Sequence, residues 1–531
     1  MRIKDILSPS FERDRWEGKG YAFPKFDIAA VREKTRSNPT WIHFGCGNIF
    51  RAFPAAVLQK LLDSGEYDRG VIVAESFDYE IVEKALIPYD NLSLLVVLKA
   101  DGNVEKKIIA SITESLRADY SFGDDWKRLE EIFAAPSLQM ASFTITEKGY
   151  TVPPADLERK LTPAMAMGKV AALLFVRFMA GAYPITLQSM DNCAHNGDVI
   201  KQAVLNYGRA WVDAKVAPAE FLAYLQDETK VSYPLSMIDK ITPHPSADVK
   251  ALLVADAFGD SDIIVTGKGT HTGAFINAEE TEYLVIEDKY TAGRPPLEKA
   301  GVIFTERETV DKVEKMKVCT CLNPLHTAMA IFGCLLGYTR ISQEMKDADI
   351  VGLITNMGHK EAMPVVVNPG VLNPREFIDT VIEKRLPNPF MPDAPQRIAS
   401  DTSQKLSIRF GETIKAYVRQ GLNLNELVLI PLTLAGYARY LRGLDDEGKT
   451  FTLSPDPKLD ELSGIVSGLE LEAGQDFSCL RSLYSREDIF GVDLYKVGLG
   501  ERIESMAGEL FEGKGAVRKT LNKYVRAVEG R

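Results

Sequence analysis

The chain has 531 residues, which is too long for one hydrophobic core, so we expect two or more domains. Its 63 lysines and arginines against 74 aspartates and glutamates give a net charge of −11, which disfavours a general nucleic-acid-binding protein. Hydrophobic residues make up 45% and charged residues 26%, the balance of a soluble globular protein, and we expect one that acts on small molecules.

The N-terminus and the cysteines indicate the compartment. Residues 1–7 have no apolar signal core, and the apolar runs at 328–338 and 427–438 are shorter than the roughly 20 residues that cross a membrane. Six scattered cysteines do not form a disulfide framework, which is typical of a reducing compartment. We therefore expect a cytoplasmic protein without membrane or nucleic-acid partners.

The first motif is a short apolar strand followed by glycines and a helix. Residues 40–44 are strand-like, and a helical pattern of apolar residues extends from 55 to 62. A loop of this kind lets the backbone approach a pyrophosphate at a helix N-terminus. Phe50 replaces the third glycine of the usual pattern. The expected cofactor contacts in this motif are Gly45, Gly47, Asn48, Ile49 and Arg51.

The next predicted strand, residues 70–75, ends in an acidic side chain. Glu75 is suited to accept hydrogen bonds from the adenosine ribose, which favours NAD over NADP. Residues 76–78 include no arginine for a 2′-phosphate. The alternative is that Glu75 only begins a solvated loop, since it lies farther from the glycines than the usual ~20 residues.

Strand-like and helical segments alternate up to about residue 212, which predicts a mainly parallel sheet covered on both faces, and the pattern from 239 to about 307 is mixed. Polar loops at residues 146–150 and 189–198 follow two of these strands, where ligands of such sheets bind. The pairs Asp191–Asn192 and Asn196–Gly197 are also ordinary turn sequences.

Long helical patterns dominate after Glu308. The predicted fold class is therefore α/β, with two domains. Residues 1–308 are expected to form a Rossmann-like, dinucleotide-binding domain with a mainly parallel sheet. Residues 309–531 are expected to form a mostly α-helical domain that holds the substrate and the catalytic groups.

One segment of the helical half, KVCTCLNPLH at residues 317–326, groups three polar side chains ahead of an apolar run. Asn323 is a good N-cap and Pro324 suits the first helical position. Lys317 would then lie in the preceding loop and His326 in the first turn, where all three groups can face one site. Each residue also has a purely structural interpretation: a cap, a solvated lysine, or a histidine bonded to a carbonyl.

Two cysteines in the same segment raise the question of a metal. Cys319, Cys321 and His326 have a suggestive spacing, but no second Cys/His pair stands nearby. Zinc usually takes three or four protein ligands. We therefore expect no metal site.

The ordered set of motifs resembles the mannitol dehydrogenase family, the long-chain polyol and uronate dehydrogenases, over nearly the whole chain. The segments that carry the resemblance are residues 42–52, 146–150, 191–197, 239–243, 293–295, 317–326, 388–389 and 397–405. The chain departs from the family at Ile49, Phe50, Phe53 and Pro324. It also has five rather than four residues between the lysine and the asparagine of residues 317–323.

The resemblance implies a zinc-independent hydride transfer with NAD as cofactor. It implies that Lys317 is the general base and that Asn192 and Asn323 polarise the reacting oxygen. It also implies that His326 holds a neighbouring hydroxyl. Oxidation of a secondary alcohol needs such a base and donors for the developing oxyanion. A lysine can be that base where burial or nearby positive charge lowers its pKa.

The expected function is the NAD-dependent interconversion of a keto sugar acid and a secondary alcohol, of the D-fructuronate/D-mannonate type. Mannitol 2-dehydrogenase and tagaturonate reductase are alternatives, and a non-catalytic dinucleotide-binding redox sensor is a rival of another class. The candidate substrate contacts are Asp191, Arg397 and Lys405. Cations between residues 384 and 409 favour an acid substrate, since a buried carboxylate needs a cationic partner. We expect a monomer or a small homo-oligomer.

Overall fold

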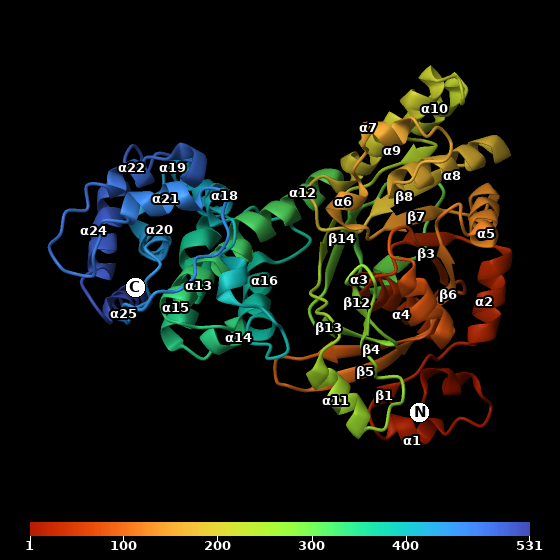
Figure 1. The fold of residues 1–531 in the computed structure, drawn as a ribbon, viewed down its shortest axis with the longest axis horizontal. Helices are drawn as coiled ribbons and strands as arrows, with labels where there is room; N and C mark the ends of the chain where they lie inside the picture. The colour runs from red at the N-terminus through yellow and green to blue at the C-terminus, as the bar shows by residue number, and fades with distance from the viewer. Residues whose placement is uncertain (531) are drawn as a thin grey trace. The chain divides into compact units, whose positions relative to one another are not determined.

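The structure is a computed structural model that describes residues 1–530, which form two compact units (Figure 1). The first unit contains residues 1–99 and 103–311, and the second contains residues 100–102 and 312–531. The chain passes from the first unit to the second within α12 (Arg307–Met316), the helix that also contains residue 308.

Six parallel strands form the central sheet of the first unit, in the order β6-β3-β2-β7-β8-β9. This is the order of dinucleotide-binding folds, in which successive strands are added first on one side of β2 and then on the other. The order reverses between β2 and β7, and ligands bind at the carboxyl ends of strands at such a point. The strands are β2 (Trp41–Phe44), β3 (Val71–Glu75), β6 (Ile112–Arg117), β7 (Met140–Phe143), β8 (Ile185–Ser189) and β9 (Val231–Ser232).

Both faces of this sheet are covered, which explains why its inner strands are nearly continuous apolar runs. Ile42 and Phe44 of β2 pack into one core with α5, α8 and α9, whereas Trp41 packs into the other with α3 and α4. The predicted Rossmann-like domain is therefore confirmed. The covering helices are α3 (Asn48–Ala52), α4 (Pro54–Asp63), α5 (Gly123–Ala134), α8 (Ala166–Gly181) and α9 (Asn196–Asp213).

The other strands of the first unit form three smaller sheets, in the orders β1-β5-β4-β13, β10-β14-β15 and β11-β12. These strands are β1 (Tyr21–Ala22), β4 (Ser93–Leu98), β5 (Val104–Ile109), β10 (Ser236–Asp239), β11 (Ile264–Val265), β12 (His271–Thr272), β13 (Phe275–Glu279), β14 (Tyr283–Glu287) and β15 (Ile303–Thr305). The remaining helices are η1 (Ile3–Leu7), α1 (Arg13–Glu17), α2 (Ile28–Ser37), η2 (Val82–Leu86), η3 (Ile87–Tyr89), α6 (Thr146–Gly149), α7 (Pro154–Leu157), α10 (Ala219–Gln226), α11 (Ala247–Ala255) and η4 (Leu297–Ala300).

The second unit is helical, as predicted, and it is built around α13 (Asn323–Leu335) and α20 (Leu429–Leu441), which pack together. A helical stretch at residues 307–335 contains an 18-residue window that is apolar enough to cross a membrane by length and composition. Because 78% of that window is buried in the fold, the stretch has the environment of a core helix.

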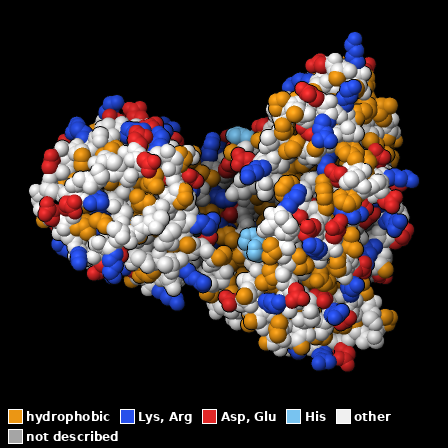
Figure 2. All heavy atoms as spheres, in the orientation of Figure 1, with side chains coloured by type: hydrophobic (Ala, Val, Ile, Leu, Met, Phe, Trp, Pro, Cys, Tyr) orange, Lys and Arg blue, Asp and Glu red, His pale blue; other side chains and the backbone are white. Residues whose placement is uncertain are grey.

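The further helices of the second unit surround this pair. They are η5 (Lys317–Cys321), α14 (Ile341–Glu344), α15 (Ala348–Asn356), η6 (Met357–Ala362), η7 (Met363–Val365), α16 (Pro374–Thr380), η8 (Val381–Arg385), α17 (Pro395–Ile398), α18 (Thr402–Leu406), η9 (Ser407–Gly411), α19 (Glu412–Gln420), η10 (Leu424–Glu426), α21 (Leu459–Val466), α22 (Leu480–Tyr484), α23 (Glu487–Phe490), α24 (Gly500–Leu510) and α25 (Ala516–Glu529). Figure 2 shows basic and acidic side chains interspersed over the visible face of each unit.

Candidate active site

The glycine loop lies at the carboxyl end of β2, where the strand order reverses. Gly45 has a φ of +107°, and a Cβ there would collide with the carbonyl oxygen of Thr144. Gly47, in contrast, has no neighbouring atom within 4 Å of where a Cβ would stand. The fold therefore requires the first glycine, whereas the second leaves open space beside the backbone, the space that a pyrophosphate needs.

Glu75, at the end of β3, is bonded to this loop. Its carboxylate accepts hydrogen bonds from the backbone N–H groups of Cys46 (2.9 Å), Ser76 (3.0 Å), Phe77 (2.9 Å) and Asp78 (3.2 Å). Burial raises the pKa of the carboxyl group, and these hydrogen bonds act in the opposite direction. The side chain thus organises the loop. A carboxylate has about four lone-pair sites, so a ribose hydroxyl would have to use the remaining capacity of Oε2.

Arg51 is fully buried within the first unit, and its two Nη groups donate hydrogen bonds inside the protein. Its guanidinium group donates to the carbonyl oxygen of Gly273 (2.8 Å), to Thr272 Oγ1 (2.7 Å) and to Asn48 Oδ1 (3.1 Å). Asn48 in turn donates to the carbonyl oxygen of His271 (3.3 Å). Asn48 and Arg51, both predicted to contact the cofactor, therefore fix α3 to β12 and to Gly273. Ile49 and the backbone of the loop remain as the candidates for cofactor contact.

Phe50 explains why the third glycine of the usual motif is absent. Its ring stacks on His43 of β2 at a centroid distance of 4.0 Å. His43 is completely buried between Ser142 Oγ (2.6 Å) and Thr144 Oγ1 (2.8 Å), and burial keeps its pKa well below the usual value. Sequence reasoning gave no role to this histidine, although a polar residue within an apolar strand was the available signal.

Asp191 joins the two polar loops at the carboxyl ends of β7 and β8. Its carboxylate accepts from the backbone N–H groups of Ile145 (2.9 Å) and Thr146 (3.1 Å) and from the hydroxyl of Tyr150 (2.6 Å). Burial raises the pKa of Asp191, and burial beside this carboxylate also raises that of Tyr150. Asp191 was predicted to contact substrate, and here its contacts hold the loops together.

Asn192, next along the chain, is exposed, so its amide can reach a ligand. Asn196 is buried and bonds the same loop to β10 through Ser236, donating to its carbonyl oxygen (2.9 Å) and accepting from its N–H (3.0 Å). Asn192 therefore lies in a loop that hydrogen bonds of Asp191 and Asn196 hold in place.

In the second unit, Lys317 does not lie in a loop as expected. It begins η5, a π-helical turn that joins α12 to α13, in which the N–H of Leu322 donates to the carbonyl oxygen of Lys317 across five residues (3.1 Å). Such turns contain one residue more than an α-helical turn and occur frequently at functional sites. Lys317 is only 5% exposed.

Asn323 was expected to be the N-cap of the following helix, and this prediction is wrong. Asn323 is the first residue of α13, and Leu322 precedes it without a side-chain cap. Because the preceding π-turn runs directly into α13, its carbonyl groups are available to the first N–H groups of the helix, which a capping side chain would otherwise satisfy. Asn323 and His326 are three residues apart and partly exposed, so they share one face of the helix.

Arg409 of η9 reaches the start of α13. Its Nη1 donates to Thr327 Oγ1 (2.5 Å) and lies 3.4 Å from the carbonyl oxygen of Asn323. Burial lowers its pKa to about 10. The structure therefore brings an arginine to the helix turn that carries the predicted asparagine and histidine.

The two predicted substrate cations have other contacts. Arg397, on α17, is 67% exposed and forms an ion pair with Asp393. Lys405, on α18, donates to the backbone carbonyl of Ser400, and burial lowers its pKa, assisted by the nearby Arg409.

The cysteines of the segment are poorly suited to bind a metal. Burial raises the pKa of Cys319 to about 11 and that of Cys321 to about 12, which disfavours the thiolate that metals bind. None of the six cysteines, all within residues 1–530, is joined in a disulfide. Within residues 1–530, no group of three or more His, Cys, Asp or Glu side chains is placed to hold a metal ion.

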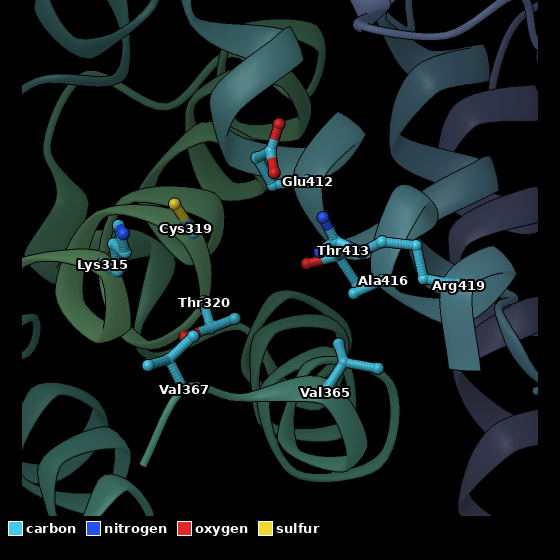
Figure 3. Close-up of a pocket in the computed structure, with 9 residues that line it drawn as sticks. All are labelled: Lys315, Cys319, Thr320, Val365, Val367, Glu412, Thr413, Ala416 and Arg419. Atoms are coloured by element: carbon cyan, nitrogen blue, oxygen red, sulfur yellow. The ribbon is translucent and has the colours of Figure 1, made fainter. Parts of the chain in front are cut away.

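Lys315, two residues before Lys317, faces a different environment. It is exposed and lines a cavity of about 260 Å³ with Cys319, Glu412 and Arg419, between the end of α12 and α19 (Figure 3). The two lysines are therefore distinguished by burial, and Lys317 is the one inside the helical core.

Family models of known proteins match both units. The mannitol dehydrogenase Rossmann domain matches residues 39–299, and the mannitol dehydrogenase C-terminal domain matches residues 309–503. The chain belongs to the mannitol dehydrogenase family. It is therefore an oxidoreductase of Rossmann type that acts on CH–OH groups, as the sequence motifs predicted.

The relatives of this family member include a sugar-acid enzyme and two polyol enzymes. The chain is 49% identical to the D-mannonate oxidoreductase of Thermotoga maritima, over 98% of both chains. A crystal structure of D-sorbitol dehydrogenase matches 94% of this chain and 97% of its own at a TM-score of 0.79 and 25% identity. The mannitol 2-dehydrogenase of Pseudomonas fluorescens, in complex with NAD and D-mannitol, matches 99% and 100% at a TM-score of 0.67 and 25% identity.

Proposed function

We propose that this mannitol dehydrogenase family member is an NAD-dependent oxidoreductase that interconverts D-fructuronate and D-mannonate in the cytoplasm. The observation that carries the proposal is the 49% identity to a D-mannonate oxidoreductase over 98% of both chains. A family member in complex with NAD supports the choice of cofactor. Tagaturonate and D-fructose are the competing substrates.

The residues of the first unit fit a dinucleotide. Gly47 leaves open space beside the backbone at the carboxyl end of β2, and Glu75 holds that loop from the end of β3. We assign the pyrophosphate to the loop backbone and the adenosine end to the neighbourhood of Glu75. When bound, NADH supplies the hydride that reduces the ketone carbon.

The residues of the second unit fit the proton transfer. We propose that Lys317 donates a proton to the ketone oxygen during reduction and accepts it during oxidation. Its 5% exposure leaves bulk water little access to the ammonium group. Asn323 donates to the oxygen as negative charge develops, and His326 holds the adjacent hydroxyl. Asn192 is a second donor to that oxygen in this proposal.

The test measures the absorbance of NADH with purified protein and a panel of substrates. We expect kcat/KM for D-fructuronate to exceed that for D-fructose by at least about 100-fold, because a carboxylate bonded to a buried cation is worth several kcal/mol. Equal or better activity on D-fructose would leave a polyol dehydrogenase. NADH binding without turnover of any substrate would leave a redox sensor.

A further inference from the structure

Arg409 is a cation of the helical half whose environment suits an anionic ligand. The helical half offers Lys384, Arg385, Arg397, Lys405 and Arg409 in one stretch of sequence. Arg397 is exposed and paired with Asp393, and Lys405 is bonded to a backbone carbonyl. Arg409 is partly buried and forms no ion pair with a described carboxylate.

The energetic state of Arg409 is unusual for a buried cation. Buried charges are ordinarily paired with an opposite charge, because the loss of hydration is costly. The hydrogen bonds of Arg409 go only to a hydroxyl and a carbonyl oxygen, at 2.5 Å and 3.4 Å from Nη1. Both use the same nitrogen, so Nε and Nη2 keep the paired N–H groups that bind a carboxylate in a bidentate manner.

The position of Arg409 relative to the catalytic candidates is fixed by α13. Asn323, His326 and Thr327 are three and four residues apart, so they lie on one face of its first turns. Arg409 contacts this face at Thr327, one residue from His326. In addition, η9 packs against η5, the turn that carries Lys317. An anion on Arg409 would therefore be held close to the groups that handle the hydroxyls.

Lys405 is a second cation close to Arg409, and it adds to the positive electrostatic potential there. The pKa of Lys405 is lowered by burial and then by the charge of Arg409, which places the two cations within interaction distance. Asp401 and Asp456 act on Lys405 in the opposite direction. These carboxylates offset part of the charge of Lys405, whereas burial alone lowers the pKa of Arg409.

We propose that Arg409 binds the substrate carboxylate and thereby sets the preference of this enzyme for sugar acids over neutral ketoses. The inference rests on the proposed function, because it names the group that selects the acid. Thr327 is a positioning residue for Arg409, since its hydroxyl accepts from Nη1. Arg397 and Lys405 contribute less to binding of the carboxylate, because Arg397 is paired with Asp393 and Lys405 is bonded to a backbone carbonyl.

The test compares D-fructuronate with D-fructose in steady-state reduction by NADH, for the wild type and the variants Arg409→Gln, Arg409→Lys and Thr327→Val. In Arg409→Gln, kcat/KM for D-fructuronate should fall by about 30- to 5,000-fold, the range for stranding a buried charge, and mainly through KM. The value for D-fructose should change less than about threefold, since it carries no charge for the guanidinium to bind. Arg409→Lys should retain more kcat/KM for D-fructuronate than Arg409→Gln does. Thr327→Val should also lower kcat/KM for D-fructuronate more than that for D-fructose, but by a smaller factor.

The control is Arg419→Gln, which removes an exposed cation one helix later and should leave both substrates unchanged. Thermal unfolding of each variant shows whether it is folded. Equal losses for the two substrates would assign Arg409 a structural role and overturn the proposal. A normal D-fructuronate rate in Arg409→Gln would overturn it also, while the proposed function would stand. A wild type that reduces ketoses but no uronate would overturn both.

Discussion

The backbone N–H of Cys46 donates a 2.9 Å hydrogen bond to Oε2 of Glu75, so the glycine loop and the end of β3 are held as one piece. Cys46 is the residue between the two glycines. The three other N–H groups on this carboxylate come from residues 76–78. One side chain thus fixes both backbone segments that a dinucleotide would contact.

We predict that Glu75→Gln raises the KM for NADH by about 10-fold, because an amide cannot accept four N–H donors and one loop hydrogen bond is lost. The kcat at saturating NADH should stay within about threefold, as Glu75 takes no part in proton transfer. The matched control is Glu83→Gln, on an exposed glutamate of the same region. Steady-state kinetics with NADH and NADPH measure both effects. A wild type that prefers NADPH would contradict the cofactor assignment.

The two glycines of the loop should respond differently to alanine. Gly45→Ala is strained by its φ of +107° and by a collision with Thr144, so it should lower thermal stability. Gly47→Ala meets no atom within 4 Å, so the melting temperature without cofactor should be unchanged while the KM for NADH rises. Differential scanning fluorimetry with and without NADH separates the two effects. Unchanged NADH affinity in Gly47→Ala would place the pyrophosphate elsewhere.

Lys317→Ala should reduce kcat by roughly 10²- to 10⁴-fold, the range for loss of a general acid–base group. NADH binding, followed by its fluorescence, should be largely retained. Lys315→Ala is the matched comparison, because that lysine is exposed and lines a separate cavity. The reverse result, with an inactive Lys315→Ala and a normal Lys317→Ala, would move the role to Lys315.

Glu344 makes stability depend on pH. It is completely buried beside Gly333, neither carboxyl oxygen has a hydrogen-bond partner among residues 1–530, and burial raises its pKa to about 9. A raised pKa means that its contribution to stability is complete below the unfolded value, 4.5, and is lost as the pH rises towards 9.

Glu344→Met should therefore stabilise the protein at pH 8, by up to about 5 kcal/mol at about 1.4 kcal/mol per pH unit, and the difference should shrink towards pH 5. Urea unfolding at a series of pH values measures this, with Glu472→Met on an exposed glutamate as the control. A pH-independent difference between wild type and Glu344→Met would show that the carboxyl group is not protonated in the folded state.

The cofactor half of the fold was predictable because its signals are local. The apolar strand before Gly45 and the acidic end of the next strand each lie within a single segment of sequence. Each has a known physical role in dinucleotide-binding folds. The family membership followed from the order of such segments. The residue roles at the site stay predictions, which the experiments above test.

The contacts that organise the site could not be predicted in the same way. Tyr150 meets Asp191 across 41 residues, and Arg409 meets Thr327 across 82. The spacing of apolar residues along the sequence predicts helices and strands, but it does not predict contacts between residues so far apart in the chain. The π-helical turn was missed for a related reason: its apolar spacing differs from an α-helix by one residue, and Asn323-Pro324 is a strong sequence for a helix start.

The π-turn also predicts how this protein tolerates changes of length. A residue deleted from a buried helix normally rotates everything beyond it by about 100°, since an α-helix has 3.6 residues per turn. Between Val318 and Cys321, however, the backbone already contains one residue more than an α-turn requires. Removing it would give a regular helix in the same register, so the gene can lose a codon at this turn and the enzyme can still fold.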